Sequence, residues 1–540
     1  MRSRFPSQLN LTLLFFLSLL AAIPLPSLAE SPAPQGPTVL GRVNGAIGSV
    51  LFFDIAQGSI QVKKVDTKGY PIIDEETGEQ AIEVVGFPFL VAVLVLGAVF
   101  FTFFYGWINV RGFKHAIDIV RGKFDKEEDE GEITHFRALT SALSATVGLG
   151  NIAGVAVAIQ LGGPGAVFWM MFLAIFGMSA KFSSCTLAQM YRKVNSNGTI
   201  SGGPMYYLDI GLREVSPYLK PLGKALALLY AVFIMGGSIG GGNMFQSNQT
   251  AEAFTSTFGL GESANAVVGI ILAILVAVVI LGGIKRIGAA TSKIVPLMCG
   301  LYVIASLIVI ITHLPAIPSA LSTIVLQAFT DNAFFGGMVG VLIMGFKRAA
   351  FSNEAGLGSA AIAHAAAKTK EPVREGLVAM LGPFIDTIVI CLMTSMVIVV
   401  TGVYADPALS SGAGNLGVTL TNAAFATVIP WFPYVLTICI GLFAYSTMIS
   451  WCYYGERGWI YLLDHLGNDV GLKTLPVFRL IFVFFTFFGS INSLTDVIDF
   501  SDLMILSLAF PNIIGSIILA PRVRAKLKDY MRRHKEGAFQ

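Results

Sequence analysis

Apolar segments that can cross a lipid bilayer follow one another along most of the chain between Val84 and Ala520. A membrane helix needs about 20 mostly apolar residues, because the hydrocarbon core is about 30 Å thick. The 540 residues are 54% hydrophobic and only 13% charged, which is too apolar for a soluble protein. The sequence therefore predicts an all-α polytopic membrane protein with eleven transmembrane helices. The expected spans are Val84–Val110, Ala138–Ala158, Val167–Tyr191, Leu222–Phe254, Ala264–Gly282, Ile294–His313, Phe334–Phe351, Leu377–Val403, Phe432–Leu463, Leu475–Ile491 and Ile498–Ala520.

Lysine and arginine occur only in alternate loops between these segments. The loop from Arg111 to Arg137 is basic, as is the tail from Arg522 to Lys535, whereas the intervening loops hold no Lys or Arg. Short basic loops stay on the cytoplasmic side. We therefore expect a multi-pass protein of the cell (inner) membrane with its N-terminus outside and its C-terminus in the cytoplasm.

The N-terminus has the pattern of an export signal. Arg2 and Arg4 precede the apolar stretch Leu9–Ile23, and small residues lead up to Ala29. The stretch is shorter than a membrane span, so cleavage after Ala29 is expected. Beyond it, Thr38–Ile60 is predicted to form a weakly amphipathic helix and Gln61–Val85 a small exposed hairpin. The expected domains are 1–29 signal peptide, 30–83 exported extension, 84–524 transporter domain and 525–540 basic cytoplasmic tail.

The second span contains a break in its helical pattern. The run SATVGLGNIAGVAVAIQLGGPG, Ser144–Gly165, has no charge and places Gly148, Gly150 and Asn151 at its middle. Freed backbone groups are tolerated in a membrane only where protein or a polar cavity receives them, and such breaks mark binding sites in secondary transporters. N–H groups around Val147–Gly150 would suit a carboxylate. The alternative is that these glycines only allow close helix packing.

Ten spans remain when the first is set aside, and two sets of five would enter the membrane from opposite sides. This is the inverted-repeat arrangement of many transporters. The first span of the second set, Phe334–Phe351, contains Gly336, Gly337, Gly340 and Gly345, which predicts an interruption at the corresponding position. The next segment, Phe351–Gly358, is interpreted either as an inner gate or as a solvated loop with a capped helix end.

Polar side chains inside spans suggest where ligands bind. Ser446, Thr447 and Ser450 carry hydroxyls of the kind that hold a small hard cation, or they bond back to their own helix. Gln246 is the amide that we expect to face the substrate path, and Asp386 is either a structural partner or part of an ion path. His115, His135, His465 and His534 lie in basic cytoplasmic segments and are expected at the surface.

Catalytic patterns are missing. The sequence has no HExxH, Walker A or GxSxG motif, and its five cysteines show no paired CxxC spacing. We therefore expect that the protein is not an enzyme.

Several motifs in order resemble one family. SATVGLGNIAGVAVAI, LGGPGAVFWM, SGGPMYYL, GGIKRIG, FSNEAGLGSA and FIDTIVIC together look like the alanine or glycine:cation symporter family, over about Val84 to Arg524. The resemblance implies a leucine-transporter-type 5+5 inverted repeat after one extra N-terminal span, and sodium-coupled uptake of alanine, glycine and related amino acids. Departures are the signal peptide, the Gln61–Val85 insertion, and Met344 where an aromatic residue sometimes stands.

The resemblance also implies site residues. Those expected to bind substrate are Thr146, Gly150, Gln246, Leu342, Ile343, Met344, Gly345, Thr447 and Trp451. Those expected to bind sodium are the carbonyls of Ser144, Val147 and Phe443 with the hydroxyls of Ser446 and Thr447.

The expected function is therefore a sodium symporter that imports small neutral amino acids by alternating access. Sodium is the co-transported ion; the partners are the amino acid and the lipid bilayer, with neither nucleic acid nor an obligate protein partner. The alternatives are an ion channel, an amino-acid sensor that does not transport, and the same fold coupled to protons. A channel would need a constriction lined by carbonyls or charged rings, and a sensor would need an output module larger than the tail after Ala520.

Overall fold

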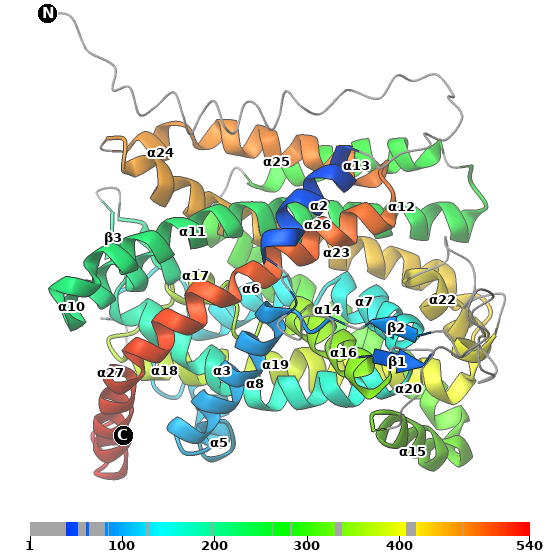
Figure 1. The fold of residues 1–540 in the computed structure, drawn as a ribbon, viewed down its shortest axis with the longest axis horizontal. Coiled ribbons are helices and arrows are strands. Elements are labelled where there is room, and N and C mark those ends of the chain that lie inside the picture. The colour runs from blue at the N-terminus through cyan, green and yellow to red at the C-terminus, as the bar shows by residue number, and fades with distance from the viewer. Residues whose placement is uncertain are drawn as a thin grey trace, which may run out of the picture.

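The computed structural model describes residues 39–51, 54, 61–63, 82–84, 86–125, 129–195, 198–261, 263–280, 283–329, 337–406, 417–467 and 469–539. The predicted signal peptide lies outside the described residues. Almost everything described is helical, with two short two-stranded sheets (Figure 1).

Among the described residues, seven helices are long and apolar enough to cross a membrane. Shorter apolar helices accompany them, and together they account for ten of the predicted segments. The predicted span Phe334–Phe351 is not among them; its described part lies in α16 (Gly337–Asn353). The total of eleven spans and their repeat remain predictions. The long candidates are His135–Gly162 (α6 and α7), Gly165–Met190 (α8), Pro217–Phe258 (α11 and α12), Ile284–Thr312 (in α14), Pro372–Thr401 (α18 to α20), Phe432–Asp464 (α23) and Leu494–Lys535 (α26 and α27). The shorter ones are Phe89–Phe104 (α3), Ala264–Ile280 (α13), Leu314–Gln327 (containing α15) and Leu475–Ser490 (α25).

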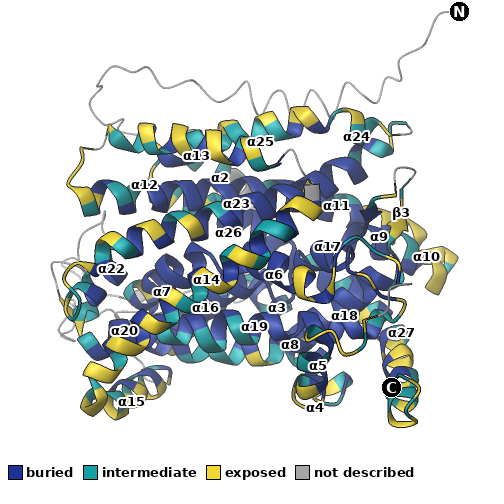
Figure 2. Ribbon diagram, turned by 180° about the vertical axis from the view of Figure 1, so that it is seen from behind, coloured by how far each residue is buried: buried dark blue, intermediate teal, exposed yellow. Residues whose placement is uncertain are grey.

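The core lies around α7, α8, α16 (Gly337–Asn353) and α23, whereas helices at the margin expose apolar surface (Figure 2). Helices α13 and α25 lie side by side at one edge in both views (Figures 1 and 2). Ile270, Ile274 and Leu480 on this pair are between 49% and 71% exposed. Large apolar side chains that face outward in this way suit contact with lipid.

The described part of the N-terminal extension packs on the apolar helices. Helix α2 (Val39–Leu51) contacts α26 (Leu494–Ser507), where Nδ2 of Asn44 donates to the Asp496 carbonyl at 3.0 Å. Strands β1 (Gln61–Lys63) and β2 (Ile82–Val84) pair antiparallel, with Gln61 opposite Val84, at the position of the predicted hairpin.

The second break lies later in the chain than its glycines indicate. Helix α16 runs without interruption through Gly340 and Gly345 to Asn353, and the chain unwinds only over 354–359 before α17 (Ala360–His364). The φ angles of Glu354, Gly356 and Gly358 are 55°, 84° and 82°. In the described part of the predicted segment, residues 337–351, the prediction of a break was therefore wrong, because Gly345 serves helix packing: a methyl group there would lie 2.5 Å from the Ala166 carbonyl oxygen.

The segment Phe351–Gly358 is also fully buried, so its interpretation as a solvated loop was wrong. Two histidines expected at the surface are buried as well. His135 is 1% exposed, because its ring contacts Glu375, and His115 is 9% exposed beneath the C-terminal helix.

Candidate functional site

The first break separates α6 (His135–Thr146) from α7 (Leu149–Gly162) at Val147 and Gly148. Its freed N–H groups are received by side-chain amides. Gly148 N–H donates to Oδ1 of Asn151 at 3.0 Å, and Leu149 N–H donates to Oε1 of Gln246 at 3.2 Å. The N–H groups that we expected to be free for a carboxylate are thus held by Asn151 and Gln246 in this conformation.

Oxygen atoms of α6 and α23 gather beside this break. The Thr447 hydroxyl donates to the Ser144 carbonyl at 3.0 Å, and the Ser144 hydroxyl donates to the Ser446 carbonyl at 2.7 Å. The Ser450 hydroxyl lies 3.0 Å from that of Ser144, and the Ser446 hydroxyl donates to the Phe443 carbonyl at 3.0 Å. Neutral hydroxyl and carbonyl oxygens are the ligands that a hard cation such as sodium prefers.

The structure therefore brings together four of the five residues predicted to bind sodium, and the fifth, Val147, forms the break itself. All of them are at most 1% exposed. The cluster is built without carboxylates, so its oxygens can hold a monovalent ion only by dipoles. Ser450 belongs to it too; its spacing from Ser446 on one helix face was the sequence signal.

The residues predicted for substrate also meet at the break, except for one segment. A methyl group on Gly148 would lie 2.4 Å from Oγ1 of Thr447, and one on Gly150 would lie 3.3 Å from the Phe351 ring. The Trp451 indole donates to the Ala145 carbonyl at 3.0 Å, which fixes its ring beside α6. This arrangement leaves little space, so it suits a small ligand.

Thr146 is buried at the same place, where its hydroxyl donates to the Leu143 carbonyl at 3.3 Å. By contrast, the segment Leu342–Gly345 lies in the uninterrupted part of α16. Met344 packs 3.0 Å from the Cβ position of Gly162, and Gly345 packs against Ala166. Phe351 and Ser352, which the sequence analysis interpreted as part of a gate or loop and not of the substrate site, occupy the position beside Gly150 instead.

A polar network ties the first break to η6 (Phe384–Cys391) and α16. Nδ2 of Asn151 donates to Oδ2 of Asp386 at 2.8 Å, and the Ser352 hydroxyl donates to Oδ1 at 2.6 Å. The Thr387 hydroxyl also donates to Oδ1, at 2.8 Å. Asp386 is thus a structural partner of the broken helix; a role in an ion path stays a prediction.

The second break is held by donors from three other helices. Nζ of Lys181 donates to the Asn353 carbonyl at 3.0 Å, and Nδ2 of Asn512 donates to the Gly356 carbonyl at 2.7 Å. The Tyr230 hydroxyl donates to the Leu357 carbonyl at 3.0 Å. Lys181 is the single charged residue of α8, and a charge inside a membrane helix was a signal that sequence analysis missed.

Two buried ionic contacts are made by helices near these breaks. On one side, Arg348 pairs with Asp502 of α26, and its guanidinium lies 5.3 Å from the centre of the Phe351 ring. On the side of the basic loops, Glu375 binds both His135 and His364, the latter at 2.5 Å. Gln246 at the first break is 2% exposed, so the site is occluded in this structure.

Breaks within apolar helices, the first of them beside buried hydroxyl and carbonyl oxygens, are typical of secondary transporters. The sequence matches the model of the sodium:alanine symporter family over residues 75–540. The chain belongs to this family, as its motifs predict.

Relatives extend this result. The chain is 42% identical over 452 residues to the sodium/alanine symporter AgcS of Methanococcus maripaludis, covering 84% of this chain and 96% of that protein. It is 34% identical to the probable sodium/glutamine symporter GlnT of Bacillus subtilis, covering 83% and 90% of the two chains. It is 35% identical to the putative sodium/proton-dependent alanine carrier protein YrbD of the same organism, covering 78% and 86%. The protein is thus a membrane transporter and not an enzyme, and sodium is its co-transported ion.

Proposed function

We propose that this protein imports alanine, glycine and similarly small neutral amino acids together with sodium, by alternating access. The observation that carries the proposal is the oxygen cluster of Ser144, Ser446 and Thr447 at the first break. The relative named as a sodium/alanine symporter supports the choice of substrate.

The crowding around Gly148 and Gly150 supports a small side chain. Their Cβ positions lie within 3.3 Å of Thr447, Gln246 and Phe351, so one wall of the site is backbone. The proposed substrate residues are Thr146, Gly150, Gln246, Thr447 and Trp451, with Phe351 added. A substrate carboxylate would take over the N–H group of Leu149 from Gln246, near the positive end of the α7 dipole.

In the proposed transport cycle, the two ionic contacts near the breaks separate one at a time. Separation of Arg348 from Asp502 would open the site on one side, and separation of Glu375 from His135 and His364 would open it on the side of the basic loops, predicted to be cytoplasmic. Sodium moving inward gains about 2.3 kcal/mol per 100 mV, and a tenfold gradient adds roughly 1.4 kcal/mol. Together these could concentrate a neutral amino acid several hundredfold.

The test is uptake of radiolabelled alanine into proteoliposomes with an inward sodium gradient. Thr447→Val keeps the shape of the side chain but removes its hydroxyl, so we expect the sodium concentration for half-maximal uptake to rise about tenfold or more. Thr437→Val is the matched control, because Thr437 is a buried threonine on the same helix that bonds Thr257 instead. An unchanged sodium dependence in Thr447→Val would contradict the assigned cation site.

Substrate class and coupling ion are tested with the same vesicles. Competition by glycine and serine, but not by glutamine or leucine, is expected for a site of this size. Uptake driven by a pH gradient in potassium alone would make protons sufficient as the driving ion. Sodium-dependent binding without accumulation would instead favour a sensor.

A further inference from the structure

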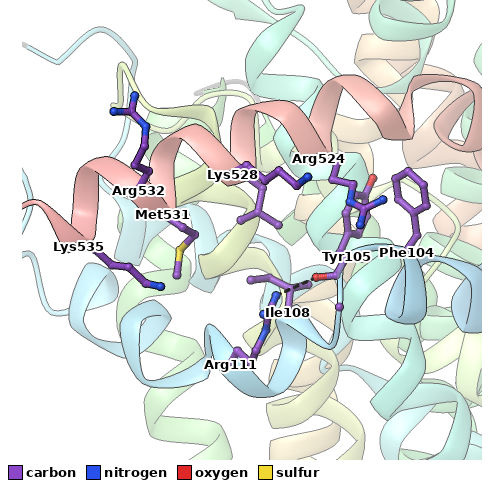
Figure 3. Close-up of a pocket in the computed structure, with 11 residues that line it drawn as sticks. Phe104, Tyr105, Ile108, Arg111, Arg524, Lys528, Met531, Arg532 and Lys535 are labelled. Carbon is purple, nitrogen blue, oxygen red and sulfur yellow. Dashed lines mark hydrogen bonds between the residues drawn. The ribbon is translucent and has the colours of Figure 1, made fainter.

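A groove far from the two breaks lies between the C-terminal helix and the end of α3 (Figure 3). Its cavity is about 680 Å³, within the usual range for small-ligand sites. One wall is α27 (Ala509–Lys535), and the other is Phe104, Tyr105 and α4 (Ile108–Arg111). The groove therefore lies where an apolar helix ends and a basic helix leaves the apolar region.

Five cationic side chains line this groove, and none of the described residues lining it is acidic. Four of them recur along α27 at nearly regular helical spacing. Figure 3 shows Arg524, Lys528 and Lys535 on the side of α27 towards Arg111, with Arg532 pointing away from it. They are Arg111, Arg524, Lys528, Arg532 and Lys535.

The acids near α27 leave most of this charge uncompensated. Arg532 pairs with Asp529 and Glu536, while Arg111, Arg524, Lys528 and Lys535 have no acidic partner within 4.0 Å among the described residues. Arg524 lies 4.9 Å from the Phe104 ring, and Arg111 donates to the Tyr105 carbonyl at 3.2 Å. Clustered cations of this kind repel one another unless an anion joins them.

A second cavity of about 810 Å³, lined by other residues of α27, shows the contrast. It also contains cations, including Arg522, but Glu214 and Asp529 line it as well, and Arg522 pairs with Glu214 at 2.6 Å. Two acids thus offset part of the charge of its four cations, Arg192, Lys370, Arg522 and Lys526. The first groove has five cations and no acid among the described residues that line it.

Apolar side chains form the remainder of the first groove, and the surface beside it suits a membrane interface. Phe104, Ile108, Leu527 and Met531 line it. Next to it, Phe103 is 60% exposed, Trp107 39% and Val110 65%. Exposed aromatic and aliphatic side chains at the end of an apolar helix are typical of the boundary between lipid and water.

We propose that this groove binds the headgroup of an anionic phospholipid. The phosphate would lie among Arg524, Lys528 and Arg111, and the first carbons of the acyl chains would follow Phe104 and Ile108 into the bilayer. Basic pockets at the cytoplasmic ends of membrane helices are suited to such headgroups. The inference depends on charge and position, and does not depend on which amino acid the protein carries.

The test is native mass spectrometry of the full-length protein released from detergent after incubation with phosphatidylglycerol or phosphatidylcholine. We expect phosphatidylglycerol adducts to persist at higher collision energy than phosphatidylcholine adducts. The triple variant Arg524→Gln, Lys528→Gln, Lys535→Gln should lower the phosphatidylglycerol occupancy at least about tenfold. The matched control Arg213→Gln, Lys220→Gln, Lys224→Gln removes three exposed cations from α10 (Leu212–Val215) and α11 (Lys220–Ile239) and should keep it.

Three outcomes would overturn the proposal. They are equal occupancy of the two lipids, equal loss in the triple variant and its control, and displacement of the lipid by millimolar inorganic phosphate, which would indicate a free-phosphate site. The single variant Lys528→Gln, at an exposed position, guards against misfolding and should show a smaller loss in the same direction. Alanine uptake by each variant, measured separately, distinguishes failure of this site from failure of the transport proposal.

Discussion

The two helix breaks differ in the side chains that pair with their freed backbone groups. At the first break, neutral amides and hydroxyls of Asn151, Gln246 and Thr447 receive the freed backbone groups. At the second break, the buried ammonium group of Lys181 donates to the Asn353 carbonyl, and the buried Glu354 is the next residue after Asn353. Where the partners are neutral, a ligand can replace them at a modest cost in free energy. Where they are charged, separating them inside a membrane costs much more free energy. The first break is therefore suited to bind and release, and the second to fix the geometry opposite it.

The largest effect is expected at the charged break. Lys181→Met would leave the Asn353 carbonyl unpaired and remove the cation that acts on Glu354, at a cost of about 3 kcal/mol or more. Thermal unfolding of the purified protein in detergent would measure this loss. The double variant Lys181→Met, Glu354→Gln should recover part of the stability. If the double variant is no more stable than the single one, the two charges do not compensate each other.

A large effect on transport is expected at the neutral break. Gly148→Ala would place a methyl group 2.4 Å from the Thr447 hydroxyl, between the proposed cation and substrate residues. We expect alanine uptake to fall at least about a hundredfold, with a stability loss of only about 1–3 kcal/mol. Gly154→Ala on the same helix is the control, because its nearest neighbour would be 3.9 Å away. Equal uptake in the two variants would show that the space around Gly148 is not used.

A smaller effect should come from the network that links the first break to its neighbours. Asn151→Ala removes the bonds to Gly148 N–H and to Asp386, which leaves buried polar groups unpaired and costs about 1–3 kcal/mol. We also expect weaker substrate binding, seen as a higher KM for alanine, because α7 loses its cap. Asn151→Asp tests the role of charge, since it would place two carboxylates in contact and should be worse than alanine. If Asn151→Asp is more stable than Asn151→Ala, a second carboxylate beside Asp386 is not unfavourable.

The smallest effect concerns a charged group outside the breaks. Nε2 of His115 lies 2.8 Å from the Tyr530 hydroxyl, and burial, followed by the nearby His534, lowers the pKa of His115 from 6.5 to about 4. Arg374 acts in the same direction and Asp118 opposes it. If the C-terminal part of α27, which carries Tyr530, moves away from His115, the His115 ring binds a proton more readily. Packing of this part of α27 on His115 is therefore fully favoured above about pH 6.5 and weakens as the pH falls towards 4.

Limited proteolysis of the tail checks this prediction. Cleavage should rise by up to about twentyfold between pH 7 and pH 5, the factor that this pKa shift gives by linkage. The ion pair of Arg533 with Glu371, at 2.6 Å, stays in place over this range. His115→Phe should reduce the pH dependence, and His465→Asn, at an exposed histidine, should keep it. A pH dependence that is unchanged in His115→Phe would assign it to another group.

Local pattern was sufficient for much of the fold and of the first break. Apolar length predicted the helices, and an amide beside two glycines predicted the break at Val147 and Gly148, because both signals belong to a few neighbouring residues. That the oxygens of Ser144, Ser446 and Thr447 lie together followed from the hydroxyls of Ser446 and Thr447 together with the family resemblance; their role in binding a cation stays a prediction. The second break was misplaced because glycine in a helix has two uses, and Gly345 serves contact with α8 rather than unwinding.

The sequence alone determined that the chain spans a membrane, where the first of the two helix breaks lies, and to which family the chain belongs. Apolar length, glycine position and motif order can all be read along the chain without knowing how the helices pack. Only the tertiary structure decided which partners each break has. Asn151 meets Asp386 across 235 positions of sequence, and Lys181 meets Asn353 across 172. Such pairs depend on how the helices pack, because inside a membrane a freed backbone group or a charge must find a partner from whichever helix lies beside it.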